Sequence, residues 1–185
     1  MILRPTYFAR IRSLLYSTWF VLISAIGIIP PLLKPGFPPN HEDETFVLRT
    51  MVYAKHFRFG DVIPVWATSD NFGMGSPLPS LYHRLFYIVS GLVFAITNNA
   101  KVSIATALIA FTSIGVYSMF LTLRSFQCSK QVAMLGASTL PFLNYSVTNW
   151  LVRGAMAEYS AMMLIPLVLY VVKKSWDRKL LHAKI

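Results

Sequence analysis

Apolar residues form five long stretches along this chain, and one long polar segment separates the first stretch from the other four. The first stretch, residues 13–33, contains 21 uncharged residues between Arg12 and Lys34. About 20 apolar residues cross the hydrocarbon core of a bilayer, so this stretch predicts a transmembrane helix that Pro30 and Pro31 end. A signal peptide would have a shorter apolar part and a small-residue cleavage site after it. We therefore expect an uncleaved first helix.

Four further apolar stretches follow the polar segment. Residues 102–123 and 131–152 each contain 22 uncharged residues, which is long enough to cross a bilayer. Residues 85–100 are short for a span, and residues 159–172 reach span length only if the helix begins near Ala155. The pattern predicts an all-α integral membrane protein with about four to five transmembrane or re-entrant helices.

The basic residues leave two topologies open. If all five stretches cross the membrane, Arg124, Lys130 and the basic tail 173–185 lie on the same side as the polar segment, against the positive-inside bias. If residues 85–100 enter the membrane and return, both basic clusters become cytoplasmic. The turn 153–158 then joins the polar segment outside. The charge distribution favours this second arrangement.

We expect a single membrane domain with one long extracytoplasmic loop. Its expected parts are a cytoplasmic N-terminus (1–12), a first transmembrane helix (13–33), the loop (34–80), a helical bundle (81–172) and a basic tail (173–185).

The loop 34–80 carries five of the seven acidic residues of the chain. Asn40 is the expected N-cap of a helix that runs to about Phe59 and stops at Gly60. The acidic residues at the start of this helix are Glu42, Asp43 and Glu44. Such a helix can lie along the membrane surface, and residues 61–79 are expected to form an extended loop after it, because they contain several prolines and glycines and show no helical period.

Composition and charge exclude several classes of partner and cofactor. The net charge is +10 and the mean hydropathy is +0.54, but the charges form clusters beside apolar stretches, so membrane orientation explains them and a nucleic-acid partner is not expected. The single cysteine, Cys128, excludes an internal disulfide and a cysteine-based zinc site. No nucleotide, haem or zinc motif is present. The cofactor is therefore unknown, with a divalent metal left open.

Three adjacent carboxylates are the first candidate site. Glu42, Asp43 and Glu44 repel one another, so at least one should have a raised pKa or a cationic partner. They would provide a general base, or a set of metal ligands completed by His41. The alternative is that acidic residues only stabilise the N-terminus of a helix.

Two further candidates contain basic residues next to apolar stretches. Arg153 would bind a phosphate oxygen, and Glu158 would orient this arginine or bind a metal. The alternative is a structural ion pair at the membrane interface. His83 and Arg84, at the start of the short stretch, would meet an anionic head group or would only anchor the chain at the interface.

Several motifs in succession resemble one superfamily. The chain has an acid followed by Arg49, then "GD..P.W" at 60–66, "G.G.P.P..Y" at 73–82 and "RGA.AE" at 153–158, with Pro166 beyond. This succession resembles the GT-C superfamily of integral-membrane glycosyltransferases. It is more closely similar to bacterial membrane proteins described as 6-pyruvoyl-tetrahydropterin-synthase-related or YfhO-like, which typically continue for several hundred residues more. The chain is therefore expected to be an N-terminal portion.

The resemblance implies a function at the outer face of the bacterial inner (plasma) membrane. A first-loop acid, Asp43 or Glu42, would be the catalytic base, and a polyprenyl-phosphate-linked sugar would be the donor. Arg153, with help from Arg84, would stabilise the leaving phosphate. The expected partners are the bilayer and the lipid-linked sugar. The alternative class is a non-catalytic membrane protein, either a component of lipid or polysaccharide transport or a truncated scaffold, so enzymatic activity stays undecided.

Overall fold

The computed structural model describes residues 19–42 and 45–182, with side chains through residue 177. The described chain is all-helical, as the apolar pattern predicts. Its α-helices are α2 (Thr45–Arg58), α3 (Leu78–Leu81), α4 (Leu85–Thr97), α5 (Ala100–Ser125), α6 (Lys130–Thr139), α7 (Asn144–Val147) and α8 (Met156–His182). Three short 3₁₀ helices, η1 (Pro30–Leu33), η2 (Asn71–Gly73) and η3 (Leu140–Phe142), and one π-helical turn, η4 (Thr148–Arg153), complete the fold.

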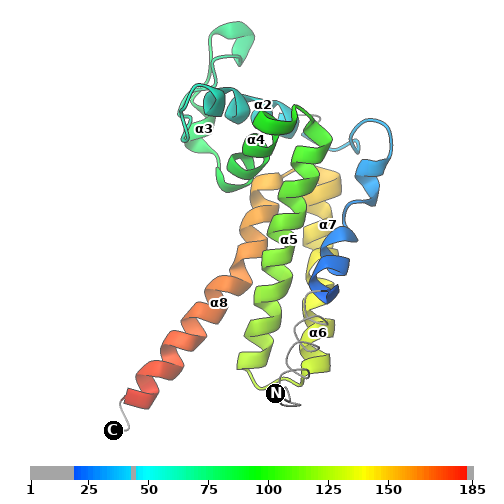
Figure 1. The fold of residues 1–185 in the computed structure, drawn as a ribbon, viewed down its shortest axis with the longest axis vertical. Helices are drawn as coiled ribbons and strands as arrows, with labels where there is room; N and C mark the ends of the chain where they lie inside the picture. The colour runs from blue at the N-terminus through cyan, green and yellow to red at the C-terminus, as the bar shows by residue number, and fades with distance from the viewer. Residues whose placement is uncertain (1–18, 43–44, 183–185) are drawn as a thin grey trace, which may run out of the picture.

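The helices form an elongated bundle with a cap on one end (Figure 1). The bundle contains α5, α8, the segment 130–153 and the helical residues 19–26. The cap contains α2, α3 and α4, and we call its end of the molecule the upper end. The lower end contains the turn between α5 and α6.

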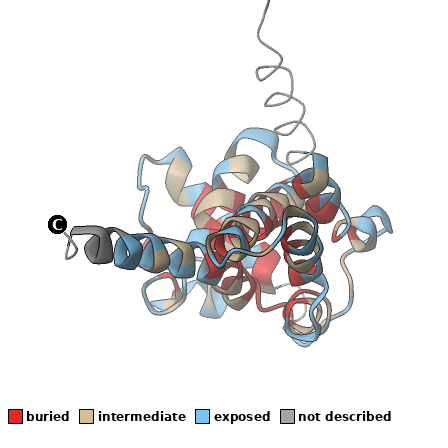
Figure 2. Cartoon of the chain, turned by 90° about the horizontal axis from the view of Figure 1, so that it is seen from below, coloured by how far each residue is buried: buried red, intermediate tan, exposed pale blue. Residues whose placement is uncertain are grey.

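Two described helices are long and apolar enough to cross a membrane. They cover Ala100–Ser125 in α5 and Met156–Asp177 in α8. Residues on the later part of α8 are largely exposed, and the same part is tan and blue in Figure 2. The exposed apolar side chains there are Ile165, Val168, Leu169, Val171 and Val172. By length and composition these two helices suggest a membrane protein, and the number of crossings stays a prediction.

Residues 131–152, which are long enough to cross a bilayer, do not form one continuous helix. This segment runs from the lower to the upper end as four short pieces: α6, η3, α7 and η4. Pro141 lies in η3, and a proline has no N–H to continue an α-helix. The Ser146 hydroxyl donates to the Leu140 carbonyl at 2.6 Å, so a side chain satisfies a backbone acceptor at the break.

The first apolar stretch is also interrupted. Its described helix covers residues 19–26 and ends before Pro30, while residues 13–18 lie outside the described part of the chain. The 3₁₀ helix η1 follows. The Trp150 indole donates to the Ile28 carbonyl at 3.1 Å, which fastens this stretch to η4.

Helix α4 lies beside α2 and the upper part of α5, and it does not extend to the lower end (Figure 1). Thr50 on α2 and Ser90 on α4 share a hydroxyl hydrogen bond of 3.0 Å. A Cβ on Gly91 would lie 2.6 Å from the Cβ of Tyr53, so a glycine permits this close packing. The segment that carries Glu42 and the turn 153–158 lie at the same end of the molecule, where the His41 N–H donates to the Val152 carbonyl.

The prediction that Asn40 caps α2 is wrong. The helix begins at Thr45, and Asn40 lies five residues earlier. The Asn40 amide donates to the Pro38 carbonyl at 3.0 Å, and its buried Oδ1 has no partner among the described residues. The side chain therefore bonds within its own turn instead of accepting a helix N–H.

Candidate functional site

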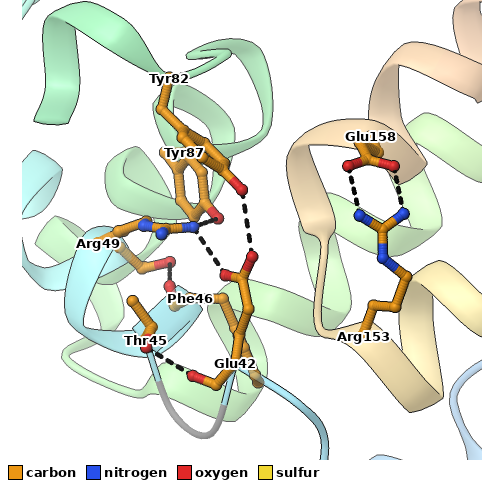
Figure 3. A network of polar contacts seen from close by, with 9 residues as sticks. Glu42, Thr45, Phe46, Arg49, Tyr82, Tyr87, Arg153 and Glu158 are labelled. Atoms are coloured by element: carbon orange, nitrogen blue, oxygen red, sulfur yellow. Dashed lines mark hydrogen bonds and ion pairs between the residues drawn. The ribbon is translucent and has the colours of Figure 1, made fainter.

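The carboxylate of Glu42 is held by two side chains from the cap (Figure 3). Its Oε2 accepts from Arg49 Nη1 at 2.9 Å, and its Oε1 accepts from the Tyr82 hydroxyl at 3.1 Å. The Arg49 guanidinium lies 4.1 Å from the centre of the Tyr82 ring, and its Nη1 donates to the Tyr87 hydroxyl at 3.3 Å. We call Glu42, Arg49, Tyr82 and Tyr87 the acid cluster.

Three elements position the acid cluster. Arg49 lies in the second turn of α2, Tyr82 follows α3 and Tyr87 lies in the first turn of α4. The Thr45 hydroxyl donates to the Glu42 carbonyl at 2.5 Å, which fixes the chain as it enters α2. Glu42 therefore has the cationic partner that the three adjacent carboxylates led us to expect.

The chemistry of the acid cluster follows from its protonation states. Burial alone would lower the pKa of Arg49, but Tyr87 and Glu42 outweigh this effect and raise the pKa, so the guanidinium stays charged. Burial raises the pKa of Tyr87, which keeps the phenol neutral. Because both oxygens of Glu42 accept hydrogen bonds, this residue is better suited to fix the loop than to take up a proton.

The other two acids of the triplet, Asp43 and Glu44, lie outside the described residues. The metal-ligand set predicted for them with His41 therefore stays a prediction. Among the described residues, no three His, Cys, Asp or Glu side chains gather closely enough to hold a metal ion.

Arg153 and Glu158 form a two-point ion pair across the turn between η4 and α8. Arg153 Nη1 and Nη2 donate to the Glu158 oxygens at 2.5 and 2.8 Å, and the Tyr145 hydroxyl donates to Glu158 Oε2 at 2.9 Å. Arg153 also donates to Asn149 Oδ1 at 2.9 Å. The hydrogen bonds that Arg153 donates to Glu158 raise the pKa of Arg153. Both side chains are about two-fifths exposed, at 43% and 40%, so an incoming anion can reach the pair.

His83 and Arg84 have different surroundings. His83 is exposed and lines a shallow hollow of about 280 Å³ together with Tyr82 and Glu158. Arg84 Nε donates to the Pro79 carbonyl at 2.8 Å, and this arginine does not line the hollow. The structure therefore brings His83, but not Arg84, to the surface that Glu158 shares with the acid cluster.

A backbone contact connects the acid cluster to the ion pair. The His41 N–H donates to the Val152 carbonyl at 2.8 Å, one residue before each of Glu42 and Arg153. Gly154 has φ +70°, and a Cβ at this position would lie 2.5 Å from Asn40 Oδ1. The loop that carries Glu42 thus docks on the turn that carries Arg153, so the acid cluster and the ion pair lie near each other at the upper end (Figure 3).

Sequence reasoning did not assign roles to the tyrosines and the asparagine that complete the site. Tyr82 was visible as the last residue of "G.G.P.P..Y", but its partner Glu42 is 40 residues away. Nothing in the local pattern distinguishes Tyr87, Tyr145 or Asn149 from other residues of apolar stretches.

The chain matches no family model, no curated protein and no solved structure. The resemblance to GT-C glycosyltransferases therefore rests on the ordered motifs of the sequence alone.

Proposed function

We propose that this chain is part of a GT-C-like membrane glycosyltransferase that takes a sugar from a polyprenyl-phosphate carrier at the extracytoplasmic face of the inner membrane. One observation supports the proposal most strongly. An acidic loop, the 82–83 segment and the turn 153–158 are far apart in sequence, yet they meet at one end of a helical bundle. Transfer from a lipid phosphate needs such a base and such a cation near the membrane surface.

The proposed roles follow from which side chains already have hydrogen-bond partners and which are exposed to solvent. Asp43 is the base, because both oxygens of its neighbour Glu42 already accept hydrogen bonds. It takes the proton of an acceptor hydroxyl, whose oxygen attacks the anomeric carbon with inversion. The bond from that carbon to the phosphate oxygen breaks. Arg153 stabilises the charge left on the phosphate, and Glu158 holds Arg153 in position.

Transfer assays in membranes that contain the expressed protein test this assignment. A general base contributes typically 10²- to 10⁴-fold in rate, and an amide cannot replace it. We expect Asp43→Asn to lower transfer of a labelled sugar from a polyprenyl-phosphate donor by about this factor, with insertion and expression unchanged. Glu44→Gln is the matched control and should be nearly silent. If Asp43→Asn keeps near-normal turnover while Glu42→Gln loses it, the base is Glu42. If all three variants are active, the catalytic assignment is withdrawn.

A second candidate function has its own support. Glu42 and Glu158 are each neutralised by an arginine and bonded by a tyrosine, which is also what a purely structural role requires. A non-catalytic membrane protein, such as a transport component or scaffold, fits these pairs. It predicts that the unaltered protein transfers no sugar from any polyprenyl-phosphate donor.

A further inference from the structure

An apolar groove lies beside the bundle at its upper end, between residues 30–39 and Leu151 of η4. It has a volume of about 480 Å³, within the usual range of small-molecule sites. Prolines form most of its wall, and Phe37 and Leu151 add further apolar surface. Because the proline ring fixes the backbone angle φ, this wall is rigid. The groove shares no residue with the hollow that His83 and Glu158 line.

The groove follows directly in the chain after a helix with an exposed apolar face. This helix, residues 19–26, packs into the bundle through the buried Val21 and Ala25. A helix that is apolar on both its buried and its exposed face is typical of a membrane environment and not of contact with water. The exposed side chains recur at helical spacing, and they are Trp19, Leu22, Ile23 and Ile26.

The apolar surface extends to the edge of the groove. Leu33, at the end of η1, is 79% exposed, and Val152, next to the lining residue Leu151, is 58% exposed. The blue segment that holds η1 stands out from the side of the bundle in Figure 1, beside the upper part of α5. If α5 crosses a bilayer, the groove and the face of the helix 19–26 are therefore open to the lipid around the bundle.

Two lysines lie where this apolar surface ends. Lys34 lines the groove, and the Lys101 ammonium donates a hydrogen bond to the Lys34 carbonyl. Among the described residues, no acidic side chain lines the groove and neither lysine forms an ion pair. The site therefore combines an apolar groove with two uncompensated positive charges at its edge, which is the complement of an amphiphile with an anionic head group.

The simpler alternative is that the two lysines only reach the polar surface of the membrane. Such lysines keep their ammonium groups in water and need no particular lipid, so a zwitterionic lipid would serve as well as an anionic one. A bound anionic lipid differs in a measurable way. Attraction to anionic lipid contributes about 1 kcal/mol per lysine near the surface, which corresponds to about fivefold in affinity.

We infer that the groove between residues 30–39 and Leu151 binds an anionic phospholipid. Its phosphate lies between Lys34 and Lys101, and its acyl chain lies on the proline wall and the exposed face of the helix 19–26. This inference goes beyond the proposed function, because the phospholipid takes no part in sugar transfer and the groove is separate from the residues proposed for it.

Lipid titrations followed by native mass spectrometry of the detergent-solubilised protein test the inference. The probes are phosphatidylglycerol and phosphatidylcholine with identical acyl chains, which differ in the net charge of the head group. We expect the first phosphatidylglycerol to bind about tenfold more tightly than the first phosphatidylcholine. The double variant Lys34→Gln/Lys101→Gln should lose about tenfold or more in affinity for phosphatidylglycerol and should keep its affinity for phosphatidylcholine.

A matched double variant controls for net charge. Lys55→Gln/Arg58→Gln removes the same charge from exposed positions on α2, and phosphatidylglycerol should bind to it as to the unaltered protein. Leu151→Trp adds volume at a lining position and should weaken binding of phosphatidylglycerol. A photoactivatable phosphatidylglycerol should crosslink to residues 30–39 or to the helix 19–26. If Leu151→Trp does not fold, the two charge variants and the crosslinks still decide.

Four outcomes would overturn the inference. They are equal affinity for the two phospholipids, equal losses in the two double variants, crosslinks confined to other segments, and displacement of phosphatidylglycerol by a lower concentration of a polyprenyl phosphate. The last outcome would assign the groove to the carrier lipid of the proposed transfer.

Lipid binding and sugar transfer can fail separately. Selective binding of phosphatidylglycerol by a protein without transferase activity would keep the groove assignment and remove the proposed function. Sugar transfer by a protein that does not distinguish the two phospholipids would do the reverse.

Discussion

Arg49 shows how much a single side chain can organise. From α2 it contacts Glu42 in the loop, the ring of Tyr82 after α3 and the hydroxyl of Tyr87 on α4. A guanidinium can do this because it is planar, donates in several directions and stacks on aromatic rings. The cap is therefore joined through one cation that is only 14% exposed.

Replacing this guanidinium by an ammonium group should be costly. Arg49→Lys keeps the charge but loses the planar stack on Tyr82, and cation–π contacts are worth about 0.5–2 kcal/mol. We expect a loss of roughly 1–2 kcal/mol in the free energy of unfolding, measured by denaturant titration in detergent. Arg58→Lys, at an exposed arginine on the same helix that donates to Asn98, should change stability by less than about 0.5 kcal/mol. Equal effects at both positions would contradict the role of Arg49.

Gly154 offers a second test at the scale of one residue. Gly154→Ala places a Cβ 2.5 Å from Asn40 Oδ1 and also strains a backbone with φ +70°. Gly60→Ala is a matched control, since its φ is +83° but no atom lies within 4 Å of the added Cβ. Strain alone costs of order 1–3 kcal/mol. We expect Gly154→Ala to lower the free energy of unfolding by more than Gly60→Ala does. The difference between the two measures how much the contact between the 40–42 loop and the turn contributes. Thermal unfolding measures both, and equal costs would show that the docking contributes nothing.

At the scale of elements, His56 connects α2 to the extended loop that follows it. His56 Nδ1 lies 2.8 Å from Asp61 Oδ2, and Nε2 lies 2.9 Å from the Trp66 carbonyl. The two ring nitrogens therefore contact two different parts of the loop. This histidine fixes the start of the segment that leads into residues 67–76, which Ala67 and Ser76 close into a hairpin.

Removing this connection should loosen the loop without unfolding the bundle. We expect His56→Ala to increase amide hydrogen exchange in residues 61–70 severalfold, while α5 stays as protected as in the unaltered protein. His83→Ala is the control, because His83 is an exposed histidine of the same cap. An unchanged exchange rate in the loop of His56→Ala would rule out the connection.

The interrupted segment 130–153 has a consequence for the site. A straight helix would continue along the bundle, whereas the break at Pro141 and the π-helical turn η4 bring Arg153 to a left-handed glycine and the start of α8. Irregular helical turns of this kind often occur at functional sites. Here η4 orients Asn149, whose Oδ1 accepts from Arg153.

At the scale of the whole molecule, most described acidic side chains lie at the upper end, and a separate group of basic side chains lies toward the lower end. Four of the five described acidic residues, Glu42, Asp61, Asp70 and Glu158, lie in the cap or beside it, where Arg49 and Arg153 pair with two of them. The turn after α5 and the later part of α8 carry a basic group toward the lower end, Arg124, Lys130, Lys173 and Lys174, together with Asp177 (Figure 1). Cytoplasmic segments of membrane proteins carry an excess of lysine and arginine. If α5 and α8 cross a bilayer, we expect the lower end to be cytoplasmic and the proposed site to be extracytoplasmic.

Cysteine labelling in intact cells tests this orientation. Native Cys128 lies in the lower turn between α5 and α6, so a membrane-impermeant maleimide should not label the unaltered protein. Met74→Cys in a Cys128→Ser background places the thiol on the exposed hairpin, where Met74 is 77% exposed, and should be labelled readily. After permeabilisation Cys128 should react as well. Labelling of Cys128 before permeabilisation would overturn the orientation.

Much of the helical structure could be predicted from the sequence, because the tendency of a long uncharged stretch to form a helix depends on residues that are close together in the chain. The long uncharged runs at 102–123 and 159–172 became α5 and α8, and the helix expected near the start of the loop became α2. The site was predictable only in part. Arg153 and Glu158 are five residues apart and could be paired by inspection, whereas Glu42 and Tyr82 are 40 residues apart and meet only because α2, α3 and α4 pack together.

The sequence by itself determined that this chain is helical and apolar, that its acidic residues gather in one loop and that its basic residues flank the apolar stretches. These properties depend on neighbours in the chain. Only the tertiary structure decided that residues 131–152 break into four pieces, that α4 stays at the upper end and that Arg49 joins Glu42 to two tyrosines. The reason is physical: packing choices such as these depend on which side chains fit against one another across the fold.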